Sequence, residues 1–369
     1  MPFGGRFIDQ IKRKKIMTTI WKKAAKNFLI SHLPISIHAR LKLRNHIRNY
    51  KSFTNRERER NFIIAQQDYM AKRVFVKSLP YLAIIDTGNI CNLKCPFCPT
   101  NNGEISFSGP KFPKALNRRH CFLDLEKYAL VLEAFGKFFF SISLFNWGEP
   151  FLNRNIFKMI SMAKQFNIEV CLSTNLNIKD PDLAQKICES YPDSLILSID
   201  GLCSETYQKY RRGGDFELVI QNLQKIAAYK KKYRLLKPEL IWQFLVFRHN
   251  EHEIPFVNSF AYSHGADNVR ISGAYIYHED WIPTNKEYPP LGANMNICNF
   301  LWTTATIEAT GSLSPCCINR DYQYDFGEFT TAQELRELWN GERICASRNF
   351  FHERKPNSEI LCDACSLIK

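Results

Sequence analysis

The stretch YLAIIDTGNICNLKCPFC, residues 81–98, joins a short apolar run to three closely spaced cysteines. The run at 82–85 is aliphatic and has the length of a buried strand. The cysteines follow it on a loop, which places them at the carboxyl end of that strand. Folds built from parallel strands carry their functional groups at this end. The stretch therefore predicts an α/β fold and indicates where its site lies.

Five more apolar runs of strand length follow, and segments with helical periodicity separate them. The runs are Phe138 to Phe145, Ile168 to Ser173, Ser194 to Ile199, Leu240 to Phe247 and Asn268 to Ser272. The helical segments are 124–135, 154–165, 182–190 and 216–230. Six strands alternating with helices predict a parallel sheet with right-handed crossovers. The sheet is either open and doubly wound or curved, and the motifs described below favour a partial (β/α)6 barrel of the TIM type.

Composition divides the chain into three parts. Residues 1–80 carry 19 Lys and Arg against 4 Asp and Glu, whereas the other 289 residues carry 31 against 32. The net charge of +14 therefore belongs to the N-terminal part. We interpret 1–80 as a basic helical arm, 81–277 as the barrel and 278–369 as a small cysteine-rich C-terminal domain. Three prolines mark the second boundary: Pro283, Pro289 and Pro290.

The sequence carries no signal for export or for a membrane span. No stretch approaches 18 uninterrupted apolar residues, and the first 20 residues lack an apolar segment with a small-residue cleavage site. We therefore expect a cytoplasmic protein. Its 13 cysteines then stay reduced, and clustered cysteines in that setting more often bind metal or do chemistry than form disulfides.

Cys91, Cys95 and Cys98 have a spacing that can hold three corners of a [4Fe–4S] cube. The fourth iron then has no protein ligand and is open to a small molecule. A structural zinc site is the alternative. Zinc is usually enclosed by four ligands, however, and the next candidates, His120 and Cys121, lie more than 20 residues away. The spacing favours a cluster with an open iron.

The same residues, with Phe97 before the last cysteine, resemble the C-x3-C-x-aromatic-C signature of the radical SAM superfamily. The resemblance implies a [4Fe–4S] cluster whose open iron is bound by the methionine part of S-adenosylmethionine (SAM). It also implies that an electron, from a donor such as flavodoxin or ferredoxin, cleaves SAM to a 5′-deoxyadenosyl radical. That radical abstracts a hydrogen atom from the substrate, while the protein orients the cofactors and excludes water.

The turn after the second strand resembles the family's Gly-Gly-Glu-Pro motif. It reads Trp147-Gly148-Glu149-Pro150. The resemblance implies that the glycine permits a close approach of the backbone and that Glu149 accepts a hydrogen bond from the SAM ammonium. Because Trp147 stands where the family has its first glycine, the close approach depends on Gly148.

Two later strand ends add further residues that the resemblance relates to SAM. Ser173 belongs to a polar turn after the third strand. Ser198, at the end of the fourth strand, and an arginine after it are similar to residues that hold the SAM carboxylate. A guanidinium suits this role because its planar fork pairs with a carboxylate. Arg211 has the better spacing, and Arg212 is the alternative.

Four cysteines of the C-terminal part can enclose a second cluster completely. They are Cys298, Cys316, Cys362 and Cys365. The G-x4-C spacing that ends at Cys316 and the final C-x2-C resemble the shortened SPASM, or twitch, domain, which implies one auxiliary [4Fe–4S] cluster. A zinc ion is the alternative, because four thiolates suit it. Cys317 is the alternative ligand to Cys316.

Residues 16–29 combine apolar side chains at helical spacing with flanking lysines, which predicts a basic amphipathic helix. Packing against the barrel or a partner is the favoured interpretation. Contact with an anionic membrane surface is the second. Nucleic acid is least favoured, because few aromatic residues are interleaved with the basic ones.

The connection 99–121, between the first cysteines and the next helix, is unusually long and basic. Long loops at the functional end of a fold are often functional, so we expect this one to shape the substrate pocket. Its charge suggests a phosphorylated or acidic substrate, and unspecific surface charge is the alternative. The basic residues are Lys111, Lys114, Arg118, Arg119 and His120.

The resemblance to SPASM and twitch relatives implies oxidation of an alcohol or side chain, modification or crosslinking of a peptide, or epimerisation. We favour dehydrogenation of a small hydroxylated substrate such as a sugar or aminocyclitol, because an auxiliary cluster can accept the electron that a substrate radical must lose. The step also needs a base, and Arg270 is a poor one because arginine stays protonated.

Two other functions compete with this interpretation. Modification of a ribosomally made peptide is weakened because residues 1–80 do not show the strand pair of a winged peptide-recognition domain. The alternative from a different class is a noncatalytic metal-binding protein whose basic arm contacts RNA or a membrane.

Overall fold

A computed structural model describes residues 56–101, 112–291, 298–355 and 357–365. Residues 57–369 form one compact unit. The amphipathic helix expected at 16–29 lies outside the described residues. None of the helices in the described part of the chain is long and apolar enough to cross a membrane.

Six parallel strands form the centre of the fold, and each pairs with the next along the chain. Their order in the sheet is β6-β5-β4-β3-β2-β1. Successive βα units produce this order, so the expected parallel α/β sheet is confirmed. The strands are β1 (Leu82–Ile85), β2 (Ser141–Ser143), β3 (Glu169–Thr174), β4 (Ser194–Ser198), β5 (Glu239–Val246) and β6 (Asn268–Gly273).

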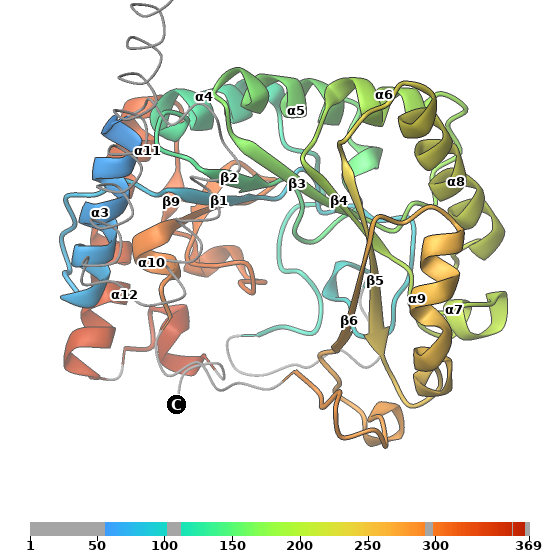
Figure 1. Ribbon diagram of the computed structural model, residues 1–369. Helices are drawn as coiled ribbons and strands as arrows, with labels where there is room; N and C mark the ends of the chain where they lie inside the picture. Colours follow the sequence, from blue (N-terminus) through green and yellow to red (C-terminus); the bar gives the residue numbers. More distant parts are fainter. Residues whose placement is uncertain (1–55, 102–111, 292–297, 356, 366–369) are drawn as a thin grey trace, which may run out of the picture. The chain divides into compact units, whose positions relative to one another are not determined.

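Helices follow the strands and lie along the outer side of the curved sheet (Figure 1). The curvature is that of a partial barrel. Two of these helices, α7 and α9, were not among the helical segments expected from the sequence. The helices are α4 (Leu125–Phe135), α5 (Ile156–Gln165), α6 (Leu183–Ser190), α7 (Ser204–Tyr210), α8 (Phe216–Lys232) and α9 (Ile254–Ser263).

The outer helices are held by apolar stripes that pack on the sheet. In α5 the fully buried residues are Ile156, Met159, Ile160 and Ala163, at the i, i+3, i+4 and i+7 positions of one helical face. Burying each of the larger aliphatic side chains contributes roughly 1.5–3 kcal/mol. This core fixes the carboxyl ends of the strands, where the cysteine loops begin.

The C-terminal part continues the same sheet on the far side of β1. Strand β7 (Thr304–Ile307) pairs in parallel with β1, and β8 (Ser312–Ser314) and β9 (Gly327–Glu328) extend the sheet antiparallel. The complete sheet therefore has nine strands among the described residues. Three helices accompany these strands: α10 (Phe300–Thr303), α11 (Ala332–Leu338) and α12 (Glu342–Glu353).

Residues 57–80 pack against this C-terminal part. Helix α3 (Arg56–Met70) carries Asp68, which accepts hydrogen bonds from Arg73 at 2.7 Å and from the Ser78 hydroxyl at 2.9 Å. The indole nitrogen of Trp302 donates to Arg73 O at 2.9 Å, and that of Trp339 donates to Ser78 O at 2.9 Å. The segment before β1 is thus part of the compact unit.

Candidate functional site

The loop after β1 carries Cys91, Cys95 and Cys98 into a pocket of apolar side chains. Cys95 is buried and the other two are half-buried. Burial raises the pKa of Cys91 to about 11 and that of Cys95 to about 12. Such thiols become thiolates at neutral pH only when a cation such as iron binds them. The apolar residues of the pocket are Leu93, Phe97, Tyr210, Phe247 and Ala274.

Phe97 lies among other aromatic rings. Its ring centroid is 5.1 Å from that of Trp281, 5.9 Å from Tyr277 and 6.0 Å from Phe247. A wall of this kind keeps water from the first cysteine loop, which strengthens electrostatic interactions there and protects reactive species.

Two N–H donors point at the thiols of the first loop. The Asn175 amide nitrogen is 3.6 Å from Cys91 Sγ, and Arg211 Nη1 is 3.8 Å from Cys95 Sγ. Hydrogen bonds to the sulfurs are one of the ways in which proteins tune iron–sulfur clusters. The donor set around the three cysteines therefore fits a bound cluster.

Glu149 is buried beside this loop. Its carboxylate accepts hydrogen bonds from Phe151 N at 3.1 Å, from the Thr174 hydroxyl at 2.7 Å and from Asn175 N at 2.7 Å. A carboxylate offers about four acceptor positions, so one remains for a further donor. Burial raises the pKa of Glu149 to about 7.

Gly148 lies where the backbone of the turn after β2 comes very close to the loop after β1. A Cβ atom at this position would lie 1.8 Å from Gly88 O and 2.7 Å from Ile90 O. Glu149 N also donates to Ile90 O at 2.9 Å. Gly148 thus permits the close approach of the turn after β2 to the loop that leads into Cys91, and its contact with SAM stays a prediction.

Ser173 and Ser198 end the neighbouring strands β3 and β4. Their hydroxyl oxygens are 3.4 Å apart, and both side chains lie at the carboxyl edge of the sheet. The structure brings the pair together with Glu149, because Thr174 follows Ser173 and bonds the Glu149 carboxylate. Their contact with SAM stays a prediction.

Arg211 follows α7 and lies over the first cysteine loop. Its Nε bonds Asp200 Oδ2 at 2.6 Å, and Asp200 Oδ1 accepts from Leu245 N at 2.7 Å. Asp200 is fully buried, so it fixes the guanidinium in place while Nη1 reaches Cys95. Two of the five N–H groups of the guanidinium are used in this way, and the others are available for a carboxylate. The neighbouring Arg212 accepts with its backbone oxygen from Lys94 N at 2.9 Å.

Cys298, Cys316, Cys362 and Cys365 come together from separate segments of the C-terminal part. Burial, and then the charges of nearby Cys317, Cys362 and Cys298, raise the pKa of Cys316. Burial, and then the charge of Cys365, raise the pKa of half-buried Cys298. The last two cysteines lie at the short helix η6 (Leu361–Ala364), where Cys365 N donates to Cys362 O at 3.3 Å. Cys317 is also near Cys298, so the choice between Cys316 and Cys317 stays a prediction.

Among the residues that the structure describes, no three His, Cys, Asp or Glu side chains lie close enough together to share one metal ion. In a [4Fe–4S] cluster each thiolate binds a different iron, so the sulfurs stand further apart than around one zinc ion.

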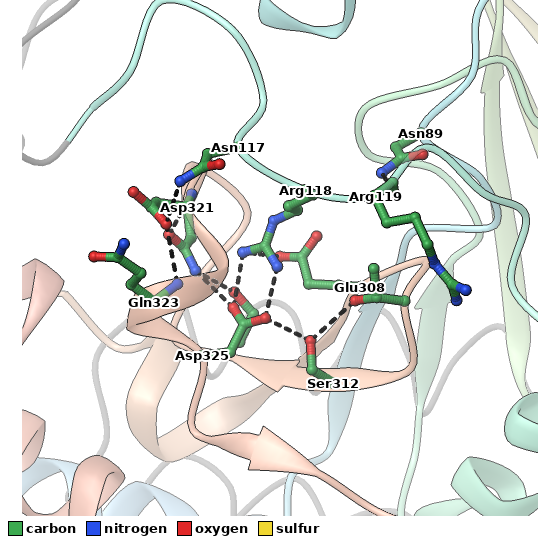
Figure 2. A network of polar contacts seen from close by, with 12 residues as sticks. Asn89, Asn117, Arg118, Arg119, Glu308, Ser312, Asp321, Gln323 and Asp325 are labelled. Atoms are coloured by element: carbon green, nitrogen blue, oxygen red, sulfur yellow. Dashed lines mark hydrogen bonds and ion pairs between the residues drawn. The ribbon is translucent and has the colours of Figure 1, made fainter.

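Arg118 is buried, which contradicts the expectation that the basic residues of 99–121 face the substrate. Its guanidinium bonds Asp325 at 2.6 and 2.7 Å, and its side chain is 0% exposed (Figure 2). A buried carboxylate pairs with a planar guanidinium because the pair satisfies both charges. Asn117 joins Asp321 at 3.0 Å nearby, so Asn117 and Arg118 attach this part of the connection to the C-terminal part. Lys114, Arg119 and His120 are exposed, and Lys111 lies outside the described residues.

The sequence did not predict a role for several residues of this region. Asn175 lies two residues after Ser173 and Asp200 two residues after Ser198, but their contacts with Cys91 and Arg211 depend on the fold. Asp86 and Glu308 were missed completely. The signal that could have found Asp86 is an acid directly after the aliphatic run at 82–85.

A partial barrel with three cysteines after its first strand, and a second cysteine group beside it, defines an iron–sulfur protein that acts from the carboxyl end of a parallel sheet. The model of the radical SAM superfamily matches residues 85–253, and that of the SPASM iron–sulfur cluster-binding domain matches 298–366. The chain belongs to the radical SAM superfamily and is an enzyme. Its cofactors are a [4Fe–4S] cluster, SAM and additional iron–sulfur in the C-terminal part.

Known proteins agree with this assignment at low sequence identity. The mycofactocin maturase MftC of Mycobacterium ulcerans is 23% identical over 309 residues, which are 74% of this chain and 77% of the relative. The Fe-coproporphyrin III synthase of Methanosarcina barkeri is 24% identical over 168 residues, 45% of this chain and 37% of the relative. The structure of Streptococcus suis SuiB bound to S-adenosylmethionine has a TM-score of 0.56 at 15% identity, with 96% of this chain and 83% of SuiB covered. SuiB shares the fold.

Proposed function

We propose that this radical SAM enzyme oxidises its substrate in the space between the two cysteine groups. One short segment after β6 supports the proposal. The Tyr277 ring is 5.9 Å from Phe97 on the first cysteine loop. Burial, and then the charge of Cys317 and that of Cys365, raise the pKa of Tyr275, which places Tyr275 near the second group. A substrate bound against this segment is within reach of both groups.

The chain's own residues bind the cofactors and exclude water. When bound, the first cluster and SAM supply a radical that takes a hydrogen atom from the substrate, and the second cluster supplies an acceptor for one electron. Cys91, Cys95 and Cys98 hold the first cluster, while Glu149 and Arg211 are positioned for the ammonium and carboxylate of SAM. A low-potential donor such as flavodoxin or ferredoxin is the partner.

A small hydroxylated molecule, such as a sugar or aminocyclitol, is the favoured substrate. Tyr275 and Tyr277 are partly exposed, at 47% and 38%. Each can present an apolar ring face and a hydroxyl group, which is the combination that binds a polyhydroxylated ring. The buried Arg118 gives no support to a phosphorylated or acidic substrate, whereas Lys114, Arg119 and His120 of the same connection are exposed.

Modification of a peptide is the second candidate. It is favoured by the maturase relative, whose match spans 74% of this chain. The fold is also shared with SuiB, which has been solved bound to the precursor peptide SuiA, with a TM-score of 0.56 at 14% identity.

The test is to reduce the reconstituted protein with dithionite in the presence of SAM and to measure 5′-deoxyadenosine. A deuterated substrate panel of sugars, aminocyclitols and peptides then follows. The true substrate transfers deuterium into 5′-deoxyadenosine and yields a product two hydrogen atoms lighter. Cys95→Ala is the control without the first cluster. If no 5′-deoxyadenosine forms after reconstitution, the proposed function is wrong. If a redox-neutral product forms, the oxidation is wrong.

A further inference from the structure

Two acids lie side by side at the carboxyl ends of β1 and β7. Asp86 is the first residue after β1, and Glu308 is the first residue after β7. The two strands pair in parallel, with Ile85 opposite Ile307, and Asp86 N donates to Ile307 O at 2.8 Å. Asp86 is 1% exposed and Glu308 is 0% exposed. Sheet pairing therefore holds two carboxyl groups together in the interior.

Three of the four oxygens of these two carboxyl groups lack a hydrogen-bond partner among the described residues. Asp86 Oδ2 and both carboxyl oxygens of Glu308 accept no hydrogen bond from the described residues. The Thr306 hydroxyl, two residues before Glu308, and Arg118 Nε are also buried without a hydrogen-bond partner among the described residues. Five of the nine buried side-chain polar atoms without a partner in the described chain thus belong to this one network. Such a concentration requires an explanation, because buried polar groups are nearly always satisfied.

The charges around the two acids do not balance. Arg118 is the cation of the group, and both of its terminal nitrogens are bonded to Asp325. Asp325 also accepts from the Ser312 hydroxyl at 2.5 Å and from the Asn319 amide at 2.9 Å. Glu308 makes only a longer ion pair with the same guanidinium, with 3.5 Å between its Oε1 and Arg118 Nη2. Figure 2 shows Arg118 between Asp325 and Glu308, so one cation serves both acids.

Three carboxyl groups and one guanidinium leave two surplus negative charges when all of them are ionised. The energetic cost of uncompensated buried charge is high, so protons are the expected compensation. Burial raises the pKa of Asp86 to about 6 and that of Glu308 to about 8. Because the two groups interact, they titrate as a pair. Near neutral pH the pair holds one proton.

The pair lies between the two cysteine groups. Asp86 Oδ1 accepts from Trp147 N at 3.3 Å, at the start of the turn that packs on the first cysteine loop. On the other side, Cys317 and Glu308 are close enough for the charge of the acid to raise the pKa of the thiol, whose main cause is burial. The charged and titratable groups that face the pair are thus Arg118, Asp325, Cys121 and Cys317.

We propose that Asp86 and Glu308 form a proton-binding pair that takes up one proton when an electron reaches the C-terminal cluster. The electron comes from the substrate radical during turnover, or from a chemical reductant in a titration. The proton comes from water and forms an O–H bond on one of the two carboxyl groups. The inference rests on the C-terminal cluster and on its proposed role as electron acceptor.

Electrostatics gives the direction of the coupling. An added electron is a negative charge in a low-dielectric interior, so it raises the proton affinity of carboxyl groups nearby. Because proton binding and reduction are thermodynamically linked, protonation of the pair stabilises the reduced cluster by the same free energy. A tenfold fall in proton activity, which is one pH unit, lowers the midpoint potential by up to about 59 mV for a one-electron couple.

The test is an EPR-monitored redox titration of the reconstituted holoenzyme at several pH values between 6 and 9. The midpoint potential of the C-terminal cluster is expected to fall with rising pH in the wild type, and this slope is expected to be largely lost in Glu308→Gln and Asp86→Asn. Glu169→Gln is the matched control, because burial also raises the pKa of Glu169 but this residue lies at the amino end of β3. A pH-independent potential in the wild type overturns the proposal.

A second measurement keeps the proposal testable if a variant binds less iron. Redox-difference infrared spectra of the wild type should show the carbonyl band of a protonated carboxylic acid upon reduction. The band should disappear in Glu308→Gln or Asp86→Asn and persist in Glu169→Gln. A potential that follows the concentration of K⁺ or Na⁺ instead of pH would mean that the pair binds a cation, and would overturn the proposal. Neither readout needs substrate, so the proton-binding pair and the proposed function can fail separately.

Discussion

The two cysteine groups are built in different ways. The first has its three cysteines within eight consecutive residues on a single loop, set in an apolar wall with two N–H donors at its sulfurs. The second is assembled from segments between Cys298 and Cys365, which only the folded C-terminal part brings together. Local sequence thus specifies the first group, while tertiary packing specifies the second. We therefore expect the two to respond differently to substitution.

The largest effect is expected from Cys95→Ala. This substitution removes a ligand from the first group, and SAM cleavage should fall below detection because the open iron is lost. The second group should remain, so the iron content should fall from about eight to about four atoms per chain. Iron counting and 5′-deoxyadenosine analysis check this expectation. A variant that loses all of its iron would show that the two groups are not independent.

Cys365→Ala should have the opposite outcome. The second cluster is lost, yet dithionite-dependent cleavage of SAM should continue, because the first loop keeps its three cysteines. Formation of an oxidised product from the true substrate should stop. Cys203→Ala is the matched control, since Cys203 is exposed and lies outside both groups. Unchanged product formation by Cys365→Ala would remove the second group from the reaction.

Arg118→Met should show how strongly the second group depends on packing. The substitution leaves Asp325 buried and without its cation, which typically costs about 3–5 kcal/mol of unfolding free energy. Urea unfolding is the measurement. Arg119→Met, at the exposed neighbouring position, should change stability by no more than about 0.5 kcal/mol. A similar loss of unfolding free energy in both variants would mean that the buried Arg118–Asp325 pair stabilises the fold no more than an exposed side chain does.

A smaller effect should appear in the pH dependence of SAM binding. Because burial raises the pKa of Glu149 to about 7, its carboxyl group becomes protonated below that value and loses its attraction for the SAM ammonium. The dissociation constant should therefore increase as the pH falls from 8 to 6, by up to about tenfold per unit below the pKa. Equilibrium dialysis with the reconstituted protein measures it. Glu149→Gln should bind more weakly at high pH and lose this dependence, whereas an unaltered profile would place the titrating group elsewhere.

The sequence predicted the barrel well because the patterns that indicate its strands and helices are local. Aliphatic runs and helical periodicities are properties of short segments, and β1, β4 and β6 lie within one residue of the expected limits. The three cysteines of the first loop were found for the same reason. In contrast, the pairing of β7 with β1 joins residues more than 200 positions apart. The network of Asp86, Arg118 and Glu308 depends on that pairing, so the sequence led us to expect Arg118 at the substrate pocket.

The β1–β7 pairing also determines where the length of the chain can vary between proteins with this fold. Adjacent strands are about 4.8 Å apart whatever the sequence between them. The pairing therefore fixes the distance between the end of β1, where the first cysteine loop begins, and the end of β7. The stretch that connects β6 to β7 does not set this spacing. Insertions and deletions in that stretch are therefore tolerable where they spare Cys298 and the aromatic residues 275–281, because the sheet itself sets the spacing of β1 and β7.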